Sequence, residues 1–489
     1  MAEKISVLMV GYESAPFYKR GGLGDVMASL PKALSQDRDI DIRIVIPHYQ
    51  AIVGSNIGEK RIGQFFINFG KKEEEVGVYK TYFPGTKIAA YFLSNKPNLS
   101  YINTRGRNKK IDQFAFFDLA VSAFVPWLSK NESWKISLVH CNDWQTALVP
   151  LILQKKMSLN LPTLLTIHNL NYQGKGSLKV LDLLHIRDED TKELKIGKPI
   201  AEINVLGEGI MHATAVSTVS PTYAKEIFEN YDHDKISDFL ERRKNAIREN
   251  HSTGLKKRED VVGILNGIDY EIWNPEIDEY IYHKFDTKNM EEGKKNNKED
   301  LLKALSLSDL PTFCFIGRIV WQKGIDILIR AVKKMKVSDF NLIFLGSGTP
   351  AIERSVLEIA KRFPKNIKAI IDYNEEMAHK FYAGSDFIVI PSRYEPCGLV
   401  QMVAMGYGTI PIAAKTGGLA DSIKDAENGI LFKKNSASSL LKSMKEALRI
   451  YEDQKQLKFM IMRALKTDFS WDNRVPLYKK LYEEMIQPK

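Results

Sequence analysis

Two cations beside a glycine-rich turn are the first residues of this sequence that are suited to hold an anion. Lys19 and Arg20 directly precede a glycine pair that ends at Gly22, and helix-like sequence follows. Glycine lets the main chain approach a ligand closely, and the free N–H groups at a helix N-terminus attract negative charge. The stretch therefore predicts a phosphate or sugar site. A dinucleotide fingerprint needs a third glycine where Met27 stands, so a nicotinamide enzyme is not indicated.

A second pair of cations follows an apolar run in the other half of the chain. Arg318 comes directly after residues 312–317, and Lys323 stands just before a helix-like run. Two such cations suit a diphosphate, because the charge of a departing nucleotide develops there and needs neutralising. The alternative is a pair of surface charges in a loop between a strand and a helix, although such loops concentrate functional residues.

A carboxylate and a second glycine turn lie at later strand ends. Glu395 stands just ahead of a helix predicted to begin at Gly398 or Leu399. It is placed either to complement the helix dipole or to accept hydrogen bonds from the hydroxyls of a sugar. Gly417 and Gly418 belong to a Lys-x-Gly-Gly-Leu turn, the pattern already met near the N-terminus. This turn either admits a ligand or is only the tight start of a helix.

Polar residues also end two runs in the first half of the chain. Asp143 is the last residue of the run 135–143, and His140 lies three residues before it. His168 is the last residue but one of the run 163–169. A single histidine at a strand end is more often structural than catalytic. The combination of both histidines with an aspartate favours a functional cluster.

The residues above lie at the ends of a regular series of short apolar runs. The runs cover residues 5–10, 42–47, 135–143, 163–169, 214–221, 312–318, 342–348, 367–373, 387–393 and 409–418. Such runs suit strands buried on both faces of a parallel sheet, and the helix-like sequence between them indicates βαβ units. We therefore predict an α/β fold with two Rossmann-like, doubly wound domains that face each other across a cleft, because ligands bind beyond the carboxyl ends of such strands.

Turn signals place the boundary between the two domains. Residues 263–275 contain Asn-Gly and end in Asn-Pro. We predict an N-terminal domain over residues 1–262, a C-terminal domain over 263–467 and a terminal segment, 468–489, whose helix packs back on the N-terminal domain. One stripe of that helix is expected to hold Leu477, Tyr478, Leu481, Tyr482 and Met485.

Composition and charge narrow the class of protein. A chain of 489 residues exceeds the roughly 250–300 that one core accommodates. The N-terminal apolar run is far shorter than the roughly 20 residues of a membrane span, and three widely separated cysteines predict neither a disulfide framework nor a metal site. The net charge of +10 suits a nucleic acid or a small anion, but residues 288–303 alternate in sign, which predicts a solvated helix face. We expect a cytoplasmic, reduced protein with neither a nucleic-acid nor a membrane partner.

The strand-end residues belong to longer motifs that resemble one family. These motifs are KRGGLGDV, HCNDWQTAL, TIHNLNYQG, GILNGIDYEIWNP, GRIVWQKGID, YEPCGLVQM and KTGGLADSI. In this order, and over nearly the whole chain, the sequence resembles bacterial glycogen synthase and plant starch synthase. The resemblance implies the glycosyltransferase-B fold, with the active site between two Rossmann-like domains. It also implies transfer of glucose from ADP-glucose, or less often UDP-glucose, to the non-reducing 4-hydroxyl of an α-1,4-glucan, with retention of configuration.

The resemblance further implies a set of catalytic residues. Lys19 would contact the donor near its phosphates and the acceptor side, while Arg318 and Lys323 would hold the diphosphate and stabilise the departing nucleotide. His168 would lie beside the anomeric centre and the 6-hydroxyl of the sugar, and Asp143 would lie near the acceptor.

The remaining residues implied by the resemblance bind the donor. Glu395 would bind the donor glucose and would also belong to the catalytic residues. Tyr373 would flank the nucleobase. Main-chain contacts would come from Gly22, Gly398, Leu399, Thr416, Gly417 and Gly418. The family commonly has a lysine where this chain has Gly207, on the acceptor side.

Retention requires either a double displacement or a front-face substitution in which the leaving phosphate helps to deprotonate the acceptor. The sequence offers no obvious nucleophile, so we expect the second. Because two cations and helix termini can clamp the leaving group, we expect no metal and no cofactor. A phosphorylase would need a pyridoxal-binding lysine motif, which is not found. A UDP-glucose-dependent enzyme and a non-catalytic glucan-binding relative remain as alternatives.

Overall fold

The computed structural model describes residues 4–53, 55, 57–102, 106–187, 202–229, 236–249 and 261–487, and its chain divides into two compact units. The N-terminal unit consists of Met1–Val219, Ala224–Ile264 and Trp471–Lys489. The C-terminal unit consists of Ser220–Tyr223 and Leu265–Ser470. The end of the chain therefore returns to the unit in which the chain began.

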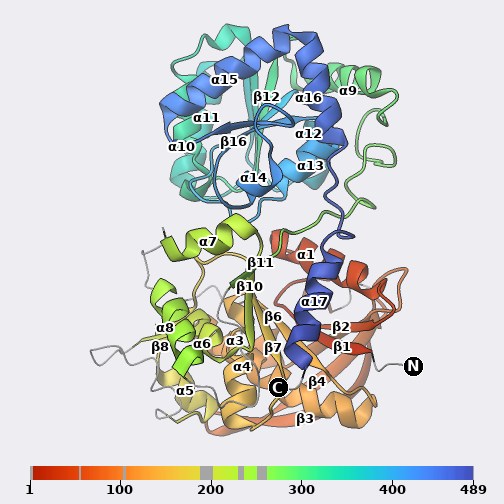
Figure 1. The fold of residues 1–489 in the computed structure, drawn as a ribbon, viewed down its shortest axis with the longest axis vertical. Helices are drawn as coiled ribbons and strands as arrows, with labels where there is room; N and C mark the ends of the chain where they lie inside the picture. The colour runs from red at the N-terminus through yellow and green to blue at the C-terminus, as the bar shows by residue number, and fades with distance from the viewer. Residues whose placement is uncertain are drawn as a thin grey trace. The chain divides into compact units, whose positions relative to one another are not determined.

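A mostly parallel sheet forms the centre of the N-terminal unit (Figure 1). In the described residues its strand order is β11-β10-β7-β6-β1-β2-β5-β4-β3. The strands are β1 (Ile5–Val10), β2 (Ile40–Pro47), β3 (Lys60–Phe69), β4 (Lys72–Tyr82), β5 (Ala89–Ser94), β6 (Leu138–Asn142), β7 (Thr163–Ile167), β10 (Ala215–Thr218) and β11 (Val261–Gly263). Every residue of β6 and β7 is buried, which explains why these strands read as continuous apolar runs.

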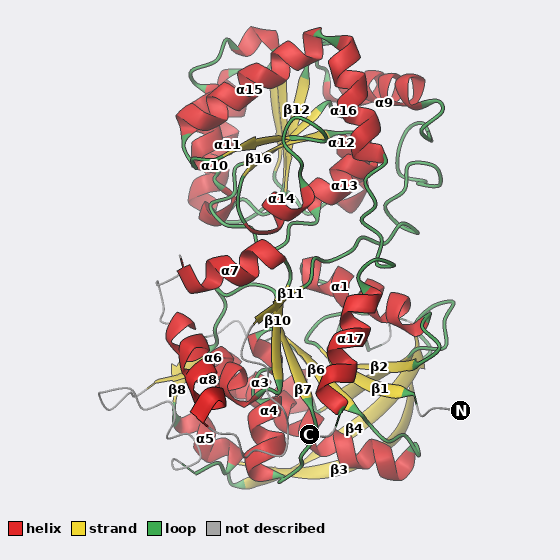
Figure 2. Cartoon of the chain, in the orientation of Figure 1, coloured by secondary structure: helices red, strands yellow, loops and turns green. Residues whose placement is uncertain are grey.

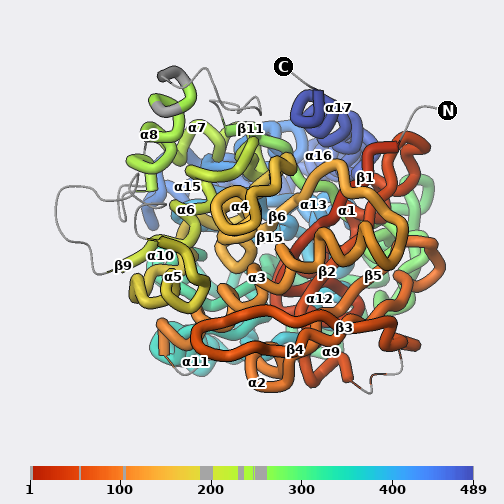
Figure 3. Tube along the Cα trace, turned by 90° about the horizontal axis from the view of Figure 1, so that it is seen from below, coloured from red at the N-terminus to blue at the C-terminus, as the bar shows by residue number. Residues whose placement is uncertain are grey.

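The far edge of this sheet is antiparallel. Strands β3 and β4 pair with each other in antiparallel register, and β4 pairs with β5 in the same way. Figure 3 shows β3 and β4 running side by side along one edge of the unit. The outer strand β3 exposes most of its residues, as an edge strand does when one face is solvated.

Helices and one short strand pair complete the N-terminal unit. The strand pair is β8 (Lys175–Ser177) with β9 (Glu202–Asn204). The helices are α1 (Gly22–Ser35), α2 (Lys96–Leu99), α3 (Arg107–Asn131), α4 (Val149–Leu151), α5 (Lys179–Leu184), α6 (Val205–His212), α7 (Pro221–Glu229), α8 (Ile236–Glu249) and α17 (Val475–Ile486). The first residues of α7 belong to the C-terminal unit. Within the described residues α3 is the one helix long and apolar enough to cross a membrane, but 78% of its apolar window is buried. Such burial is typical of a core helix in a soluble protein.

The last helix, α17, packs into the same hydrophobic core as β1 and β2. Its residues Tyr478, Leu481, Tyr482 and Met485 belong to this core, whereas Leu477 is 50% exposed, so the expected stripe was wrong at that position. The Tyr482 hydroxyl lies 2.8 Å from Nδ1 of His140, which ties α17 to the centre of the sheet.

The C-terminal unit is a doubly wound parallel sheet. Its strand order is β14-β13-β12-β15-β16-β17, so the chain builds the sheet outward in one direction and then in the other. The strands are β12 (Thr312–Ile316), β13 (Asn341–Leu345), β14 (Ile367–Ile370), β15 (Phe387–Ile390), β16 (Ile410–Ala414) and β17 (Ile430–Phe432). Together with the sheet of the N-terminal unit, this order confirms the predicted α/β fold with two doubly wound parallel sheets.

Helices cover both faces of the second sheet (Figure 2). One face carries α10 (Ile325–Val332), α11 (Pro350–Arg362) and α15 (Ala437–Glu452). The other carries α12 (Glu375–Gly384), α13 (Val400–Gly406) and α16 (Gln454–Leu465), with α9 (Met290–Leu305) beside α12 and the short helix α14 (Gly417–Ser422) after β16.

Candidate active site

The switch point of the C-terminal sheet gathers several of the predicted residues. Strands β12 and β15 are neighbours, yet the chain leaves them toward opposite sides of the sheet. Such a point leaves a crevice beyond the carboxyl ends of the two strands, where ligands bind in folds of this type. Arg318 follows β12 and Glu395 follows β15, so both lie at this switch point.

Glu395 and Lys323 form a buried ion pair at the switch point. Nζ of Lys323 donates to Oε2 of Glu395 at 2.5 Å, and the Ser392 hydroxyl donates to the same oxygen at 2.8 Å. The side chain of Glu395 is only 8% exposed and that of Lys323 17%. The structure therefore brings together two residues that lie 72 positions apart in the sequence.

Further contacts hold the loops after β12 and β15 to each other. Nη2 of Arg318 donates to Oε1 of Gln322 at 3.3 Å, and Nε2 of Gln322 donates to the Tyr394 carbonyl at 3.2 Å. Arg393 makes a bidentate contact with Asp326 at 2.8 and 2.9 Å. Sequence reasoning missed Gln322, Asp326 and Arg393. Their positions in the strand-end motifs GRIVWQKGID and SRYEP were the signal available.

The second glycine turn packs directly on the segment that carries Glu395. The main-chain N–H of Gly418 donates to the carbonyl oxygens of Glu395 at 3.0 Å and Pro396 at 3.2 Å. A Cβ on Gly417 would overlap the carbonyl oxygen of Glu395, and one on Gly418 would overlap that of Cys397. Glycine is needed here because two main-chain segments touch.

The remaining donor-binding predictions lie at three further places in the C-terminal unit. Gly398 has φ +72, and Leu399 is the residue that precedes α13. Thr416 is extended and precedes α14. Tyr373 follows β14, which is separated from β15 by the two strands β13 and β12; the residue is 65% exposed, and its hydroxyl lies 3.3 Å from Oε2 of Glu375. Tyr373 therefore lies at a different position along the sheet from the Lys323–Glu395 pair.

The N-terminal sheet has its own switch point between β1 and β6. Lys19 and Gly22 follow β1, and Gly22 is the first residue of α1. Nζ of Lys19 forms an ion pair with Oδ1 of Asp25 at 2.7 Å, so this cation is held against the first turn of α1. The predicted contact of Lys19 with a phosphate therefore requires it to share or exchange that partner.

Asp143 and His168 meet at the ends of the adjacent strands β6 and β7. Oδ1 of Asp143 accepts hydrogen bonds from the main-chain N–H groups of His168 at 2.7 Å and Asn169 at 3.3 Å, and the backbone of Asp143 has a positive φ of 60. Nε2 of His168 lies 2.9 Å from Oδ1 of Asn142. Burial raises the pKa of Asp143 to about 7 and lowers the pKa of His168 to about 3.

His140 has the structural role that is more common for such a histidine. Its Nδ1 contacts the Tyr482 hydroxyl at 2.8 Å and its Nε2 contacts the Thr166 hydroxyl at 2.6 Å, with no exposed surface. Both ring nitrogens are therefore occupied inside the protein. Gly207 also has a packing reason: a Cβ there would lie 2.7 Å from ring atoms of Phe239, so this ring would have to move before the position could hold the lysine of the family pattern.

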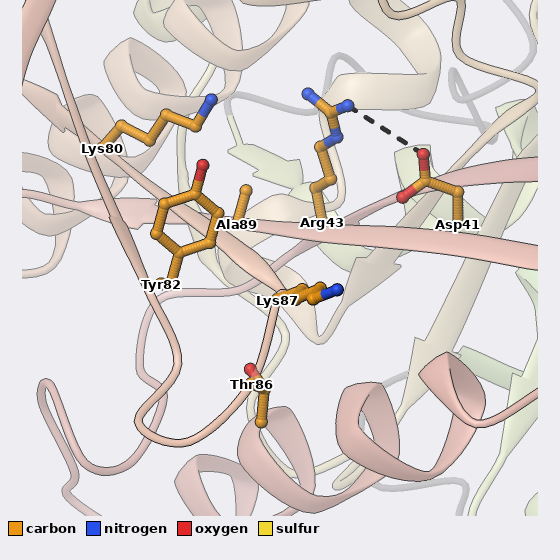
Figure 4. Close-up of a pocket in the computed structure, with 7 residues that line it drawn as sticks. All are labelled: Asp41, Arg43, Lys80, Tyr82, Thr86, Lys87 and Ala89. Atoms are coloured by element: carbon orange, nitrogen blue, oxygen red, sulfur yellow. Dashed lines mark ion pairs between the residues drawn. The ribbon is translucent and has the colours of Figure 1, made fainter.

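A separate hollow of about 480 Å³ lies at the amino-terminal ends of β2 and β5 (Figure 4). Its lining residues are Asp41, Arg43, Lys80, Tyr82, Thr86, Lys87 and Ala89. None of the predicted site residues lines it. Because Asp41 and Ala89 stand at the start of β2 and β5, the hollow lies at the opposite end of these strands from the loops that carry the predicted site residues.

We expect replacement of Asp143 by asparagine to stabilise the fold increasingly as the pH rises. A carboxyl whose pKa is raised by folding contributes stability that is fully present below its unfolded pKa, near 3.9, and is lost as the pH passes its folded pKa of about 7. The stability of Asp143→Asn relative to the parent should therefore grow between pH 4 and pH 8, by on the order of 4 kcal/mol. Denaturant unfolding at several pH values measures this difference, and a difference independent of pH contradicts it. The same variant should lose activity.

Comparisons with known proteins identify the family of this chain. The chain matches the starch synthase catalytic domain over residues 6–242 and the glycosyl transferases group 1 model over residues 297–459. It is 36% identical over 519 residues to the glycogen synthase of Thermodesulfovibrio yellowstonii, with 99% of this chain and 98% of that protein covered. It is also 36% identical over 491 residues to the glycogen synthase of Kosmotoga olearia, with 99% and 98% covered.

Two solved structures share the architecture. The catalytic domain of starch synthase IV from Arabidopsis thaliana, bound to ADP and acarbose, superposes with a TM-score of 0.86 at 27% identity over 99% of this chain and 100% of that one. A sucrose-phosphate synthase from Thermosynechococcus elongatus, at 18% identity and a TM-score of 0.60, shares the fold over 98% of this chain and 99% of its own.

Two doubly wound sheets with polar residues at their switch points, together with these matches, define a glycosyltransferase of the glycosyltransferase-B fold. Within that class, the chain belongs to the glycogen and starch synthase family. The resemblance read from its motifs is therefore confirmed, and the protein is a hexosyltransferase. The roles of its individual site residues stay predictions.

Proposed function

We propose that the enzyme transfers glucose from ADP-glucose to the non-reducing 4-hydroxyl of an α-1,4-glucan, with retention of configuration. The observation that carries this proposal is the group at the C-terminal switch point, where Arg318 and Lys323 accompany the buried carboxylate of Glu395. Family membership supplies the class of reaction, and a starch synthase of the same fold binds ADP and acarbose.

In the proposed reaction, the bond between the anomeric carbon and the diphosphate oxygen breaks while the acceptor hydroxyl attacks from the same face. Negative charge develops on the leaving diphosphate, where Arg318 and Lys323 neutralise it. The hydroxyl proton passes to an oxygen of the leaving phosphate, so the step balances without an enzyme nucleophile. Glu395 accepts hydrogen bonds from the hydroxyls of the transferred glucose, and the main chain at Gly398, Leu399 and 416–418 contacts the donor.

Residues of the N-terminal unit take the remaining roles in this proposal. Lys19 and the main chain at Gly22 contact the donor phosphates, and Asp143 acts on the acceptor side. His168 lies beside the anomeric centre. Because burial lowers its pKa to about 3, His168 is neutral at physiological pH and serves as a hydrogen-bonding group rather than a cation.

Transfer is proposed to need no metal and no other cofactor. Two fixed cations at the switch point supply the charge that a metal would otherwise bring to the leaving group. Activity should accordingly survive exhaustive treatment with EDTA. We also propose a cytoplasmic location, which the three buried, free cysteines support.

The choice of donor is tested by offering ADP-glucose and UDP-glucose side by side with a glucan primer. Stacking on Tyr373 suits adenine and uracil alike, so the support for ADP-glucose comes from the family and from the ADP-bound starch synthase. We expect faster release of ADP than of UDP, with matching growth of the glucan. Faster release of UDP contradicts the donor assignment. Glucan binding without release of either nucleotide supports a non-catalytic relative instead.

A further inference from the structure

Glu13 is a buried carboxylate that contacts the glycine-rich loop before α1. It lies three residues after β1 and has no exposed surface. Its Oε2 accepts hydrogen bonds from the main-chain N–H groups of Arg20 and Gly21, the latter at 3.1 Å. These two amides stand between Lys19 and Gly22, the first residue of α1.

The burial of Glu13 is costly for the fold. An ionised carboxyl group that leaves water loses solvation free energy unless its oxygens are paired. Oε1 of Glu13 has no donor in good hydrogen-bond geometry among the described residues, and burial raises the pKa of this group even though the Tyr12 hydroxyl and the amides of Arg20 and Gly21 favour its ionised form. A side chain that costs stability at this position is expected to serve the site rather than the core.

The contacts of Glu13 explain how the loop keeps its shape. Gly21 precedes α1 in an extended conformation and has no side-chain cap of its own. Two hydrogen bonds from a fixed acceptor orient consecutive amides, and so fix the path of the main chain from Lys19 into α1. Glu13 is also close enough to Asp143 that its charge adds to the effect of burial in raising the pKa of Asp143.

We propose that Glu13 is a positioning residue that holds the loop from Lys19 to Gly22 in the conformation needed for donor binding. The inference rests on the proposed function, in which Lys19 and Gly22 contact the donor phosphates. Glu13 itself touches no substrate, because its side chain is fully covered by the protein.

The kinetic test compares Glu13→Ala with Glu13→Gln. The alanine variant loses the acceptor, so we expect the KM for ADP-glucose to rise by roughly 10- to 100-fold while the KM for the glucan changes little, since small displacements of a binding group have effects of this size. The glutamine variant keeps an oxygen acceptor and should recover a KM within about threefold of the parent.

Asp118→Ala is the matched control for loss of a buried carboxylate. Asp118 lies in α3, has no exposed surface and accepts from the main-chain N–H of Leu148 at 2.9 Å. Its replacement should lower thermal stability without changing the ratio of the donor KM to the glucan KM. If the KM for ADP-glucose rises as much in Asp118→Ala as in Glu13→Ala, the effect at Glu13 is due to general destabilisation of the fold, and the proposal is overturned.

Hydrogen exchange separates this inference from the proposed function. Peptides covering residues 17–24 should exchange faster in Glu13→Ala than in the parent and at nearly the parent rate in Glu13→Gln, whether or not ADP-glucose is the donor. Unchanged exchange in Glu13→Ala overturns the positioning role. Faster exchange with an unchanged KM for the active donor shows that loop order is not required for binding and also overturns it. A parent enzyme that releases no nucleotide refutes the proposed function instead.

Discussion

Replacing Lys323 by alanine lowers kcat for glucan synthesis by about 10²–10³, and replacing Arg318 by alanine has an effect of the same order. This is the size observed when one preorganised donor to a developing negative charge is removed. Because the charge on the diphosphate is greater in the transition state than in the bound donor, kcat and kcat/KM should fall together. Steady-state kinetics with ADP-glucose and a glucan primer measures both values.

Loss of Lys323 also leaves the buried carboxylate of Glu395 without its cationic partner, and this has a separate effect on stability. Removing one partner of a buried ion pair destabilises proteins by roughly 3–5 kcal/mol. Lys323→Ala combined with Glu395→Gln relieves the unpaired charge, so thermal stability should recover in the double variant while kcat stays low. Lys334→Ala, which removes an exposed lysine just after α10, serves as the control and should keep normal activity. Near-normal turnover in Lys323→Ala and Arg318→Ala contradicts the assigned role.

The second large effect is expected for Gly418→Ala. The new Cβ would lie 2.5 Å from the Cα of Cys397 and still closer to its carbonyl oxygen, so the two main-chain segments must separate. Separation breaks the hydrogen bonds from the Gly418 amide to the Glu395 and Pro396 carbonyls and displaces Glu395. We expect a loss of activity of about 100-fold, because displacements near 1 Å have effects of this size.

Gly85→Ala is the control for the general effect of adding a methyl group to a turn glycine. Gly85 has φ +69, and a Cβ there meets nothing within 4 Å. Its replacement introduces backbone strain of roughly 1–2 kcal/mol without steric overlap. Thermal unfolding and activity should be measured for both variants. Full activity in Gly418→Ala shows that the turn does not position Glu395.

The buried parallel strands were predictable because their residues form continuous apolar runs. Such runs matched β1, β2, β6, β7 and β10 in the first half and the central strands of the second sheet. The edge strand β14 lies within the predicted run 367–373, but the edge strand β3 of the first sheet was missed for a physical reason. Residues 60–69 form β3, which exposes most of its side chains and mixes apolar with charged residues, so no buried run marks it.

The alternating charges of residues 288–303 predicted only part of the environment of their helix. The segment contains most of α9, which has the predicted solvated face at Glu291, Lys295 and Glu299, but Lys294 and Lys298 are each only 8% exposed and belong to its buried face. Nζ of Lys294 donates to the Ser385 carbonyl at 2.6 Å and to the Thr409 hydroxyl at 2.8 Å. A lysine can bury its aliphatic stem when its amine finds such acceptors, and no local pattern in the sequence reveals them.

For the candidate site, sequence reasoning found the segments better than the contacts. Strand-end positions follow from the topology of parallel sheets, which is why Arg318, Glu395 and Asp143 could be named in advance. The partners of Lys19 and Lys323 depend on side-chain direction across separate segments. Sequence spacing does not fix that direction, so neither ion pair was predicted, and neither was the loop contact made by Glu13.

Calorimetric titration with ADP tests most directly whether the fixed charges of the C-terminal unit hold the diphosphate of the donor. Hydrogen bonds to charged groups contribute about 1.5–3 kcal/mol each, so the double variant Arg318→Ala with Lys323→Ala should bind ADP at least about tenfold more weakly than the parent. Lys334→Ala should bind ADP with the parent affinity. An ADP affinity that is the same in the double variant and the parent would contradict the proposed diphosphate clamp.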